Sequence, residues 1–122
     1  MTTNVPRVLV IDDEAVLRGL LRDMLSACGY DVDLADNGAA GVACFKQKSY
    51  RAVITDLLMP GMDGFEVAGV LRTIDPAVKI IMLTGSAPHL TAGRAREAGL
   101  TLLHKPIALS DLKAAVDAAC RL

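Results

Sequence analysis

The chain has 122 residues, the size of one domain built around one hydrophobic core. Hydrophobic residues make up 52% of it and charged residues 22%, a composition that excludes a disordered chain. Thirteen basic and fourteen acidic residues give a net charge of −1 without a basic cluster, so we expect no direct nucleic-acid binding. Because no apolar run reaches the length of a membrane span and no signal sequence precedes the first strand, we expect a cytoplasmic protein without membrane insertion. The odd number and irregular spacing of Cys28, Cys44 and Cys120 favour reduced, partly buried thiols over a zinc site or a disulfide.

Short apolar segments alternate with longer helical patterns along the whole chain. The expected strands are 7–11, 31–35, 52–55, 78–83 and 101–104. The first, third and fourth are almost continuously apolar, which is typical of strands in the middle of a parallel sheet. In the second, aspartates alternate with Val32 and Leu34, and this pattern indicates an edge strand.

The helical segments between these strands carry signals for where they begin and end. After the first strand, one expected helix face consists of Leu17, Leu20, Leu21, Met24, Leu25 and Cys28. Gly29 follows that helix in the position of a left-handed C-terminal cap. The third helix is predicted to begin at "DGFE", where Asp63 and Glu66 have the spacing of a capping box.

The last two helices differ in how strongly their patterns predict a buried face. The fourth, at about 89–98, has a thin apolar face formed by Leu90, Ala95 and Ala98. The fifth begins at Ser110 or just before it, and its apolar stripe consists of Leu112, Ala115, Val116 and Ala119. Repeated strand–helix units predict a doubly wound α/β domain, with a parallel sheet covered by helices on both faces. We expect one such domain over residues 1–122.

Polar residues end four of the five predicted strands. Asp12-Asp13, Asp56, Thr84 and Lys105-Pro106 follow the first, third, fourth and fifth strands. Ligands of doubly wound sheets bind at the carboxyl ends of the strands, so these side chains are expected in one pocket. Carboxylate oxygens with room for water and phosphate suit Mg²⁺, which would also relieve the repulsion between the acids. Asp56 can then act as a nucleophile toward phosphorus, while Thr84 and Lys105 bind the phosphate oxygens.

Each of these residues also has a simpler interpretation. Either Asp12 or Asp13 could cap a helix, but capping needs one acid and leaves the other unexplained. For Asp63, helix capping is the preferred interpretation. Asp56 and Thr84 could begin turns, and Lys105 could be a solvated surface residue.

The motifs that contain these residues resemble those of a known family. "VLVIDDE", "AVITDLLMPGMDGFE", "IIMLTG" and "HKPI" occur in the order and at the spacing typical of the receiver domain of two-component response regulators. The similarity covers essentially the whole chain and extends to chemotaxis-type regulators. It implies a flavodoxin-like fold with five parallel strands in the order 2-1-3-4-5 and five helices.

The resemblance also implies a role for each site residue. Asp56 would be the phosphoacceptor, and Mg²⁺ would be bound by Asp13, Asp56 and the backbone carbonyl of Leu58, with Asp12 acting mainly through water. Thr84 and Lys105 would detect the phosphorylated state. The Lys105–Pro106 peptide bond is expected to be cis.

In function, the resemblance implies a switch and not an enzyme with a separate substrate. Asp56 would receive its phosphoryl group from a histidine kinase or a histidine phosphotransfer protein. A downstream protein would bind the surface formed by the fourth helix, the fifth strand and the fifth helix. Two alternatives remain: a receiver that belongs to a longer regulator or hybrid kinase, and a module that only mediates interactions. A flavin or nucleotide enzyme is disfavoured because "DDEAVLR" replaces a glycine-rich loop after the first strand.

Two features of the sequence bear on how the switch operates. Receivers often carry Tyr or Phe three residues before the lysine, whereas this chain has Leu102. A switch that moves an aromatic ring inward therefore cannot operate in its usual form. Leu58 and Ser86, two positions after Asp56 and Thr84, lack a long polar side chain that could orient an attacking water. We therefore predict slow loss of the phosphoryl group.

Overall fold

The computed structural model describes residues 5–85 and 88–121 of the chain. Within these ranges a parallel sheet has the strand order β2-β1-β3-β4-β5. The strands are β1 (Arg7–Ile11), β2 (Asp31–Ala35), β3 (Ala52–Asp56), β4 (Lys79–Thr84) and β5 (Thr101–His104). The helices are α1 (Ala15–Ala27), α2 (Gly38–Gln47), α3 (Gly64–Ile74), α4 (Pro88–Glu97) and α5 (Leu109–Cys120). The predicted fold class and strand order are confirmed.

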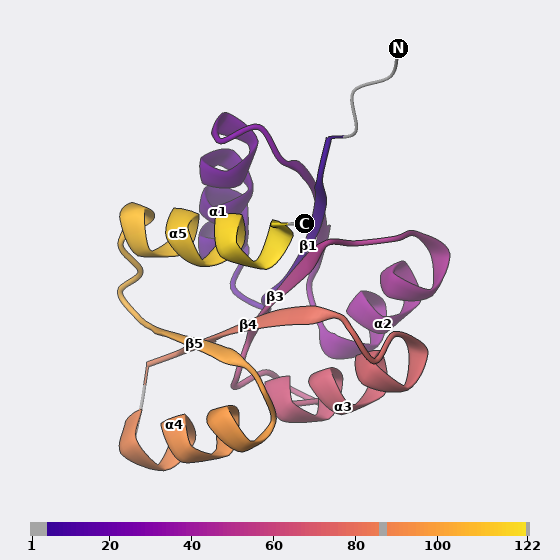
Figure 1. The fold of residues 1–122 in the computed structure, drawn as a ribbon, viewed down its shortest axis with the longest axis vertical. Helices are drawn as coiled ribbons and strands as arrows, with labels where there is room; N and C mark the ends of the chain where they lie inside the picture. The colour runs from indigo at the N-terminus through magenta and orange to yellow at the C-terminus, as the bar shows by residue number, and fades with distance from the viewer. Residues whose placement is uncertain (1–4, 86–87, 122) are drawn as a thin grey trace.

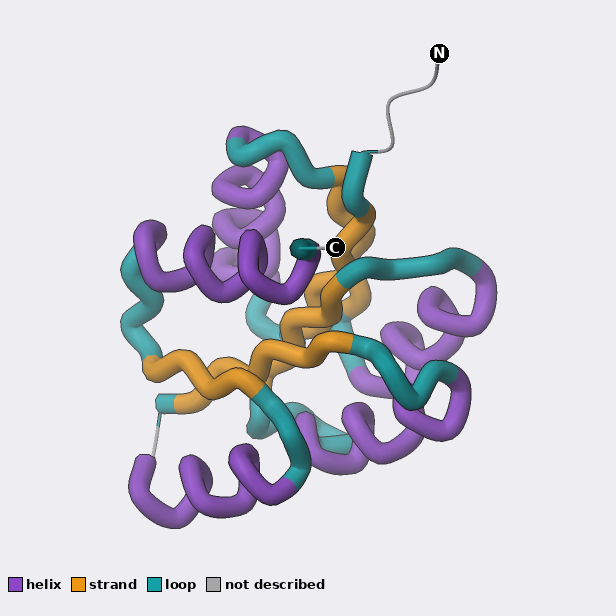
Figure 2. The backbone as a smooth tube through the Cα atoms, in the orientation of Figure 1, coloured by secondary structure: helices purple, strands orange, loops and turns teal. Residues whose placement is uncertain are grey.

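The sheet separates two layers of helices, with α1 and α5 on one face and α2, α3 and α4 on the other (Figure 1). Successive side chains of a strand point to opposite faces, so β1 contributes to two cores. Val8 and Val10 pack in the core beneath α1 and α5, whereas Leu9 and Ile11 pack in the core beneath the other helices. Figure 2 shows the strands as a twisted central layer between these helices. This double coverage explains why the sequence of β1 is apolar without alternation.

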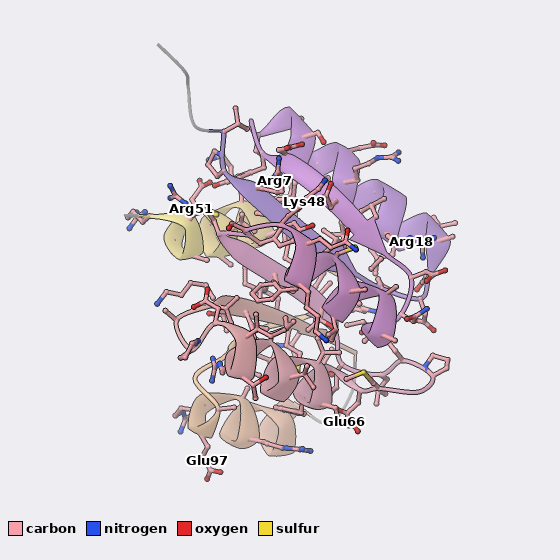
Figure 3. The ribbon with its side chains drawn as sticks, turned by 90° about the vertical axis from the view of Figure 1, so that its right-hand side faces the viewer. Arg7, Arg18, Lys48, Arg51, Glu66 and Glu97 are labelled. Carbon is pink, nitrogen blue, oxygen red and sulfur yellow. The ribbon has the colours of Figure 1, made fainter. Side chains whose placement is uncertain are left out.

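Strand β2 lies at one edge of the sheet, as its alternating sequence predicted. Its aspartates form ion pairs there: Asp31 Oδ2 lies 3.2 Å from Arg7 Nε, and Asp33 Oδ2 lies 3.4 Å from Lys48 Nζ. Arg7 and Lys48 are visible in Figure 3, where they belong to different segments of the chain. Charges along this strand disfavour pairing with the edge of another sheet.

Helix α1 differs from its predicted packing at one position. Leu21 and Leu25 are buried, and Leu17 and Met24 pack partly against the same core, but Leu20 is 53% exposed. The expectation that Leu20 belongs to the buried face is therefore wrong. Its neighbour Val16 is exposed as well, so α1 presents an apolar strip to the solvent.

The helix ends show which of the predicted caps form. Asp63 and Glu66 make the predicted capping box, in which Asp63 Oδ1 accepts a hydrogen bond from the Glu66 amide at 2.8 Å and Glu66 Oε1 accepts one from the Asp63 amide at 3.0 Å. Gly29, after α1, has φ = 94°, the left-handed conformation expected of it. Helix α5 begins at Leu109 and has no side-chain cap, so Ser110 lies within its first turn. Over the described residues, no helix combines the length and apolar character needed to cross a bilayer.

Candidate functional site

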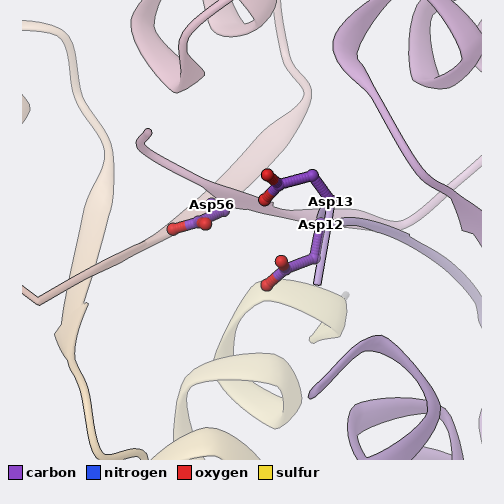
Figure 4. Close-up of side chains that lie close together, drawn as sticks. All are labelled: Asp12, Asp13 and Asp56. Atoms are coloured by element: carbon purple, nitrogen blue, oxygen red, sulfur yellow. The ribbon is translucent and has the colours of Figure 1, made fainter. Parts of the chain in front are cut away.

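Three carboxylates meet at the carboxyl ends of two adjacent strands. Asp12 and Asp13 follow β1 and Asp56 ends β3, and these strands pair directly in the sheet. One carboxylate oxygen from each residue lies within 4.8 Å of the other two. The three side chains extend toward the same space (Figure 4). Asp12 is fully buried and Asp56 is 7% exposed, whereas Asp13 is exposed to solvent.

Only one of the two carboxylate oxygens of Asp12 has a hydrogen-bond partner among the described residues. Its Oδ1 accepts a hydrogen bond from the Glu14 amide at 2.9 Å. Its Oδ2 is buried and has no hydrogen-bond partner among the described residues. Burial raises the pKa of this carboxyl, an effect that the Glu14 amide opposes and that the charge of Asp56 reinforces. Neither Asp12 nor Asp13 caps α1, because Glu14 occupies the N-cap position.

Asp56 is held by one amide and one cation. Its Oδ1 accepts a hydrogen bond from the Leu57 amide at 2.9 Å and lies 3.2 Å from the Nζ of Lys105. Burial raises the pKa of Asp56, although the positive charge of Lys105 acts in the opposite direction. Desolvation therefore outweighs the ion pair, and the carboxylate is an energetically costly group in its ionised form.

Thr84 and Lys105 complete the other side of the site. Thr84 is 1% exposed at the end of β4, and its carbonyl accepts a hydrogen bond from the Lys105 amide at 2.7 Å. The Lys105–Pro106 peptide bond is cis. A cavity of about 240 Å³ opens between the strand ends, and its lining consists of Asp56, Leu57, Leu58, Thr84, Gly85 and Lys105. Leu58, 66% exposed, stands at the rim of this cavity.

The structure thus brings together the five side chains predicted to form the site, Asp12, Asp13, Asp56, Thr84 and Lys105. It also adds contacts that the sequence did not suggest. Arg18 Nη1 donates a hydrogen bond to the backbone carbonyl of Asp12 at 2.8 Å, and Gly64 packs directly on the end of β3. No short-range motif identifies either contact, because each joins segments whose relative placement depends on the whole fold.

The donor set suits a hard divalent cation. Carboxylate oxygens are the ligands that Mg²⁺ prefers, and it usually binds one or two of them while keeping water on its other positions. Asp12 Oδ2 is a buried acceptor that no described group satisfies, and such an oxygen is costly unless a cation or proton neutralises it. Asp13 is exposed, so the ion would be reached from solvent. The residues present therefore fit a magnesium site.

Comparison with known proteins identifies the family. A sequence model of the response regulator receiver domain matches residues 8–117. The chain therefore belongs to the receiver domains of response regulators. It is 35% identical over 107 residues to the response regulator receiver protein CpdR of Brucella abortus, an alignment that covers 87% of this chain and 89% of that protein.

Longer relatives carry the same domain as one part. The transcriptional regulatory protein ResD of Bacillus subtilis is 40% identical over 97 residues, which cover 80% of this chain but 40% of ResD. The chain therefore spans less than half the length of that relative.

Solved structures show the same fold. A response regulator receiver domain protein from Clostridium thermocellum superposes with a TM-score of 0.91 at 30% identity, over 95% of this chain and 94% of that one. The chemotaxis protein CheY4 of Vibrio cholerae gives a TM-score of 0.89 at 26% identity, over 95% and 99% of the two chains.

Proposed function

We propose that this receiver domain accepts a phosphoryl group on Asp56 in a Mg²⁺-dependent reaction and thereby changes the surface formed by α4, β5 and α5. The observation that carries the proposal is the position of Asp56, a buried carboxylate between the other two acids and Lys105. The donor would be a phosphohistidine of a histidine kinase or a histidine phosphotransfer protein. The domain acts as a signalling switch, and the only reactions it promotes are gain and loss of its own phosphoryl group.

The proposed reaction transfers the phosphoryl group from a histidine nitrogen of the donor to Asp56. A carboxylate oxygen of Asp56 attacks phosphorus, an O–P bond forms, and the N–P bond to the donor imidazole breaks. The leaving imidazole takes up a proton. A divalent cation held by Asp13, Asp56 and the Leu58 carbonyl, with Asp12 acting mainly through water, would neutralise charge on the transferred phosphoryl group. The Lys105 side chain is 26% exposed and its Nζ lies 3.2 Å from Asp56 Oδ1. After transfer, this ammonium can therefore interact with the phosphate oxygens.

Acetyl phosphate provides the direct test of this function, because it supplies a phosphoryl group without a kinase. We expect intact-mass analysis to show one added phosphoryl group in the presence of Mg²⁺ and none in the presence of a chelator. Asp56→Asn should remain unmodified under the same conditions. An unmodified wild-type protein would favour the alternative of a module that only mediates interactions, and an adduct on Asp56→Asn would identify a different acceptor.

Magnesium should stabilise the fold by mass action, since it binds the native acid cluster and not the unfolded chain. We expect the melting temperature to rise with millimolar Mg²⁺, a range of about 1–10 mM suited to weak sites. Asp13→Asn should remove most of this rise, because Asp13 supplies the solvent-facing carboxylate. A wild-type melting temperature that does not respond to Mg²⁺ contradicts the metal site.

The lifetime of the phosphoryl group should depend on Leu58. This apolar side chain lines the cavity beside Asp56 and cannot hydrogen-bond an attacking water. We expect Leu58→Asn to accelerate hydrolysis, because an amide can position water in line with the breaking bond. Decay of the labelled protein after donor removal measures the rate, and equal rates in the two proteins would refute this explanation. Ser86 lies outside the described residues, and Ser86→Ala is expected to change the rate little.

A further inference from the structure

We infer that the contact between Phe65 and Arg94 holds α4 in its unphosphorylated position, and that phosphorylation releases α4 by breaking it. The inference rests on the proposed phosphorylation of Asp56. The Phe65–Arg94 contact would connect Asp56 to α4 without the aromatic residue that receivers often carry at position 102. Here that position is a partly buried leucine.

The part of helix α4 whose side chains the structure describes, residues 92–97, contributes little apolar surface to the core. Among its described side chains, Ala95 is buried at 1% exposure, while Arg94, Arg96 and Glu97 are exposed. An alanine buries far less apolar area than the leucines that hold α1 and α5, so its contribution is correspondingly small. In this part of the helix, the contacts of the Arg94 side chain and of the carbonyls at the C-terminal end therefore contribute to its position alongside Ala95.

One of these contacts fixes the C-terminal end of α4. Arg72 of α3 donates hydrogen bonds to the carbonyl oxygens of Ala98 and Gly99, the latter at 3.1 Å. These carbonyls lie where the helix ends, and Gly99 turns the chain away with φ = 71°. A guanidinium at this end also interacts favourably with the helix dipole. Arg72 therefore provides a fixed point for the helix.

The second contact joins α4 to the first turn of α3. The guanidinium carbon of Arg94 lies 4.0 Å from the centroid of the Phe65 ring, which is a cation–π geometry. Phe65 follows Gly64, whose amide donates a hydrogen bond to the Leu57 carbonyl at 2.8 Å. A Cβ at Gly64 would lie 2.7 Å from the carbonyl oxygen of Asp56. The backbone that carries the ring is thus held against the phosphoacceptor strand.

Phosphorylation would pull on the other end of α4. A phosphoryl group on Asp56 attracts the Thr84 hydroxyl, and Thr84 is joined to Pro88, the first residue of α4, by residues 85–87. Because Arg72 holds the C-terminal end, a displacement of the N-terminal end rotates the helix about that end. Arg94 lies one helical turn before Ala98, so it moves less than the first turn of α4, but we expect the rotation to lengthen the distance between its guanidinium and the ring because Phe65 stays with β3. The contact thus belongs to one of two positions of α4, which is what a two-state switch requires.

The test uses beryllofluoride, which mimics the phosphoryl group, with Mg²⁺ and the full chain. Removing a contact that exists only in the unphosphorylated state should make the mimic bind more tightly. We expect Phe65→Leu and Arg94→Gln each to strengthen apparent binding about two- to fivefold, the range expected of one cation–π contact at the surface. The double variant should gain no more than either single variant, since both remove the same contact. Amide exchange in α4 should become faster in all three proteins without the mimic.

Arg96→Gln is the matched control, because it removes the same charge from an exposed position on the same helix. It should leave beryllofluoride binding unchanged. If the wild-type protein fails to bind beryllofluoride, the proposed phosphorylation site is wrong. If the wild-type protein binds it but Phe65→Leu and Arg94→Gln bind equally well, or if Arg96→Gln has the same effect as Arg94→Gln, the inference about α4 is wrong and the phosphorylation site stands. Because Arg94 is exposed, we expect Arg94→Gln to remove the contact without disturbing the hydrophobic core.

Discussion

Asp12→Asn is expected to make the protein more stable in the absence of Mg²⁺, by about 1–3 kcal/mol at neutral pH, the cost of a buried acceptor without a partner. The Asp12 carboxylate is fully buried, and its Oδ2 has no hydrogen-bond partner among the described residues. Asparagine keeps an oxygen for the Glu14 amide and replaces the unpaired, charged oxygen with a neutral donor, which can pair with the carboxylates of Asp13 and Asp56 because an oxygen of each lies within 4.8 Å of one on Asp12. Urea unfolding in a chelator measures the difference. A variant less stable than wild type would contradict this account.

The same residue predicts how stability depends on pH. Burial raises the pKa of Asp12, so the folded state binds a proton more readily than the unfolded chain, where the value is near 3.8. Stability without Mg²⁺ should therefore increase as the pH falls from neutral through the folded-state pKa toward about 4. Asp56 should change the stability in the same direction as Asp12, because burial raises its pKa too. Asp12→Asn should show a smaller increase over this range, and Mg²⁺ should oppose the increase because protons and the ion compete for the same carboxylates.

Asp33 limits the lower end of that pH range. The hydrogen bond from the Tyr50 hydroxyl, 2.6 Å long, lowers the pKa of Asp33. A group with a lowered pKa contributes stability above its unfolded-state value and loses it as the pH falls through its folded-state value. We therefore expect the gain from Asp12 and Asp56 to be visible above about pH 4 and to be offset at more acidic pH. Unfolding of wild type and Asp12→Asn, compared at each pH, separates the two effects.

Gly64→Ala should destabilise the fold by about 1–3 kcal/mol, the usual cost of forcing an extra methyl group into a packed site. The new Cβ would meet the Asp56 carbonyl oxygen at 2.7 Å, Met82 Cε at 3.0 Å and Leu57 Cα at 3.1 Å. Two of these atoms are backbone and cannot move as a side chain does. We also expect slower phosphorylation by acetyl phosphate, because the methyl group displaces the strand end that carries Asp56, the proposed acceptor.

Gly69→Ala on the same helix is the matched control for Gly64→Ala. Apart from its two chain neighbours and the backbone of its own helix, a Cβ at Gly69 would have no heavy atom within 4 Å. Replacing glycine with alanine inside a helix then favours the folded state by about 0.5–1 kcal/mol, since alanine has less conformational freedom to lose. The two variants should therefore shift the urea midpoint in opposite directions. Destabilisation of similar size by both would show that helix propensity, and not the close approach to Asp56, explains the result.

Most of the site could be predicted because its residues end strands of one parallel sheet. Apolar runs locate β1, β3, β4 and β5, and parallel strands present their carboxyl ends at the same edge, so Asp12, Asp56, Thr84 and Lys105 had to lie near one another. The capping box at Asp63 is local in sequence and was equally accessible. These predictions needed only short-range patterns and one rule of sheet topology.

The features that the sequence did not predict depend on how helices and strands pack against one another in three dimensions. The apolar positions of α1 span a wider arc than the sheet covers, so the sequence could not show that Leu20 is exposed while Leu21 is buried. Gly64 was predicted only as part of a helix start, because nothing local reveals the backbone of β3 behind it. The Phe65–Arg94 contact joins two helices whose separation is set by the intervening strand β4 and by Arg72.

The spread of the site residues along the chain also has a consequence for synthesis. Synthesis from the N-terminus produces Asp12 and Asp13 before Asp56, and Asp56 before Lys105. Lys105 reaches Asp56 only after β5 has paired with β4, and among the strand pairs of this sheet this one becomes possible last during synthesis. A ribosome-bound fragment that lacks β5 therefore has the Asp56 carboxylate without the ammonium of Lys105 beside it. If Asp56 is the phosphoacceptor, as proposed, such fragments would compete poorly for the phosphodonor with chains whose sheet is complete.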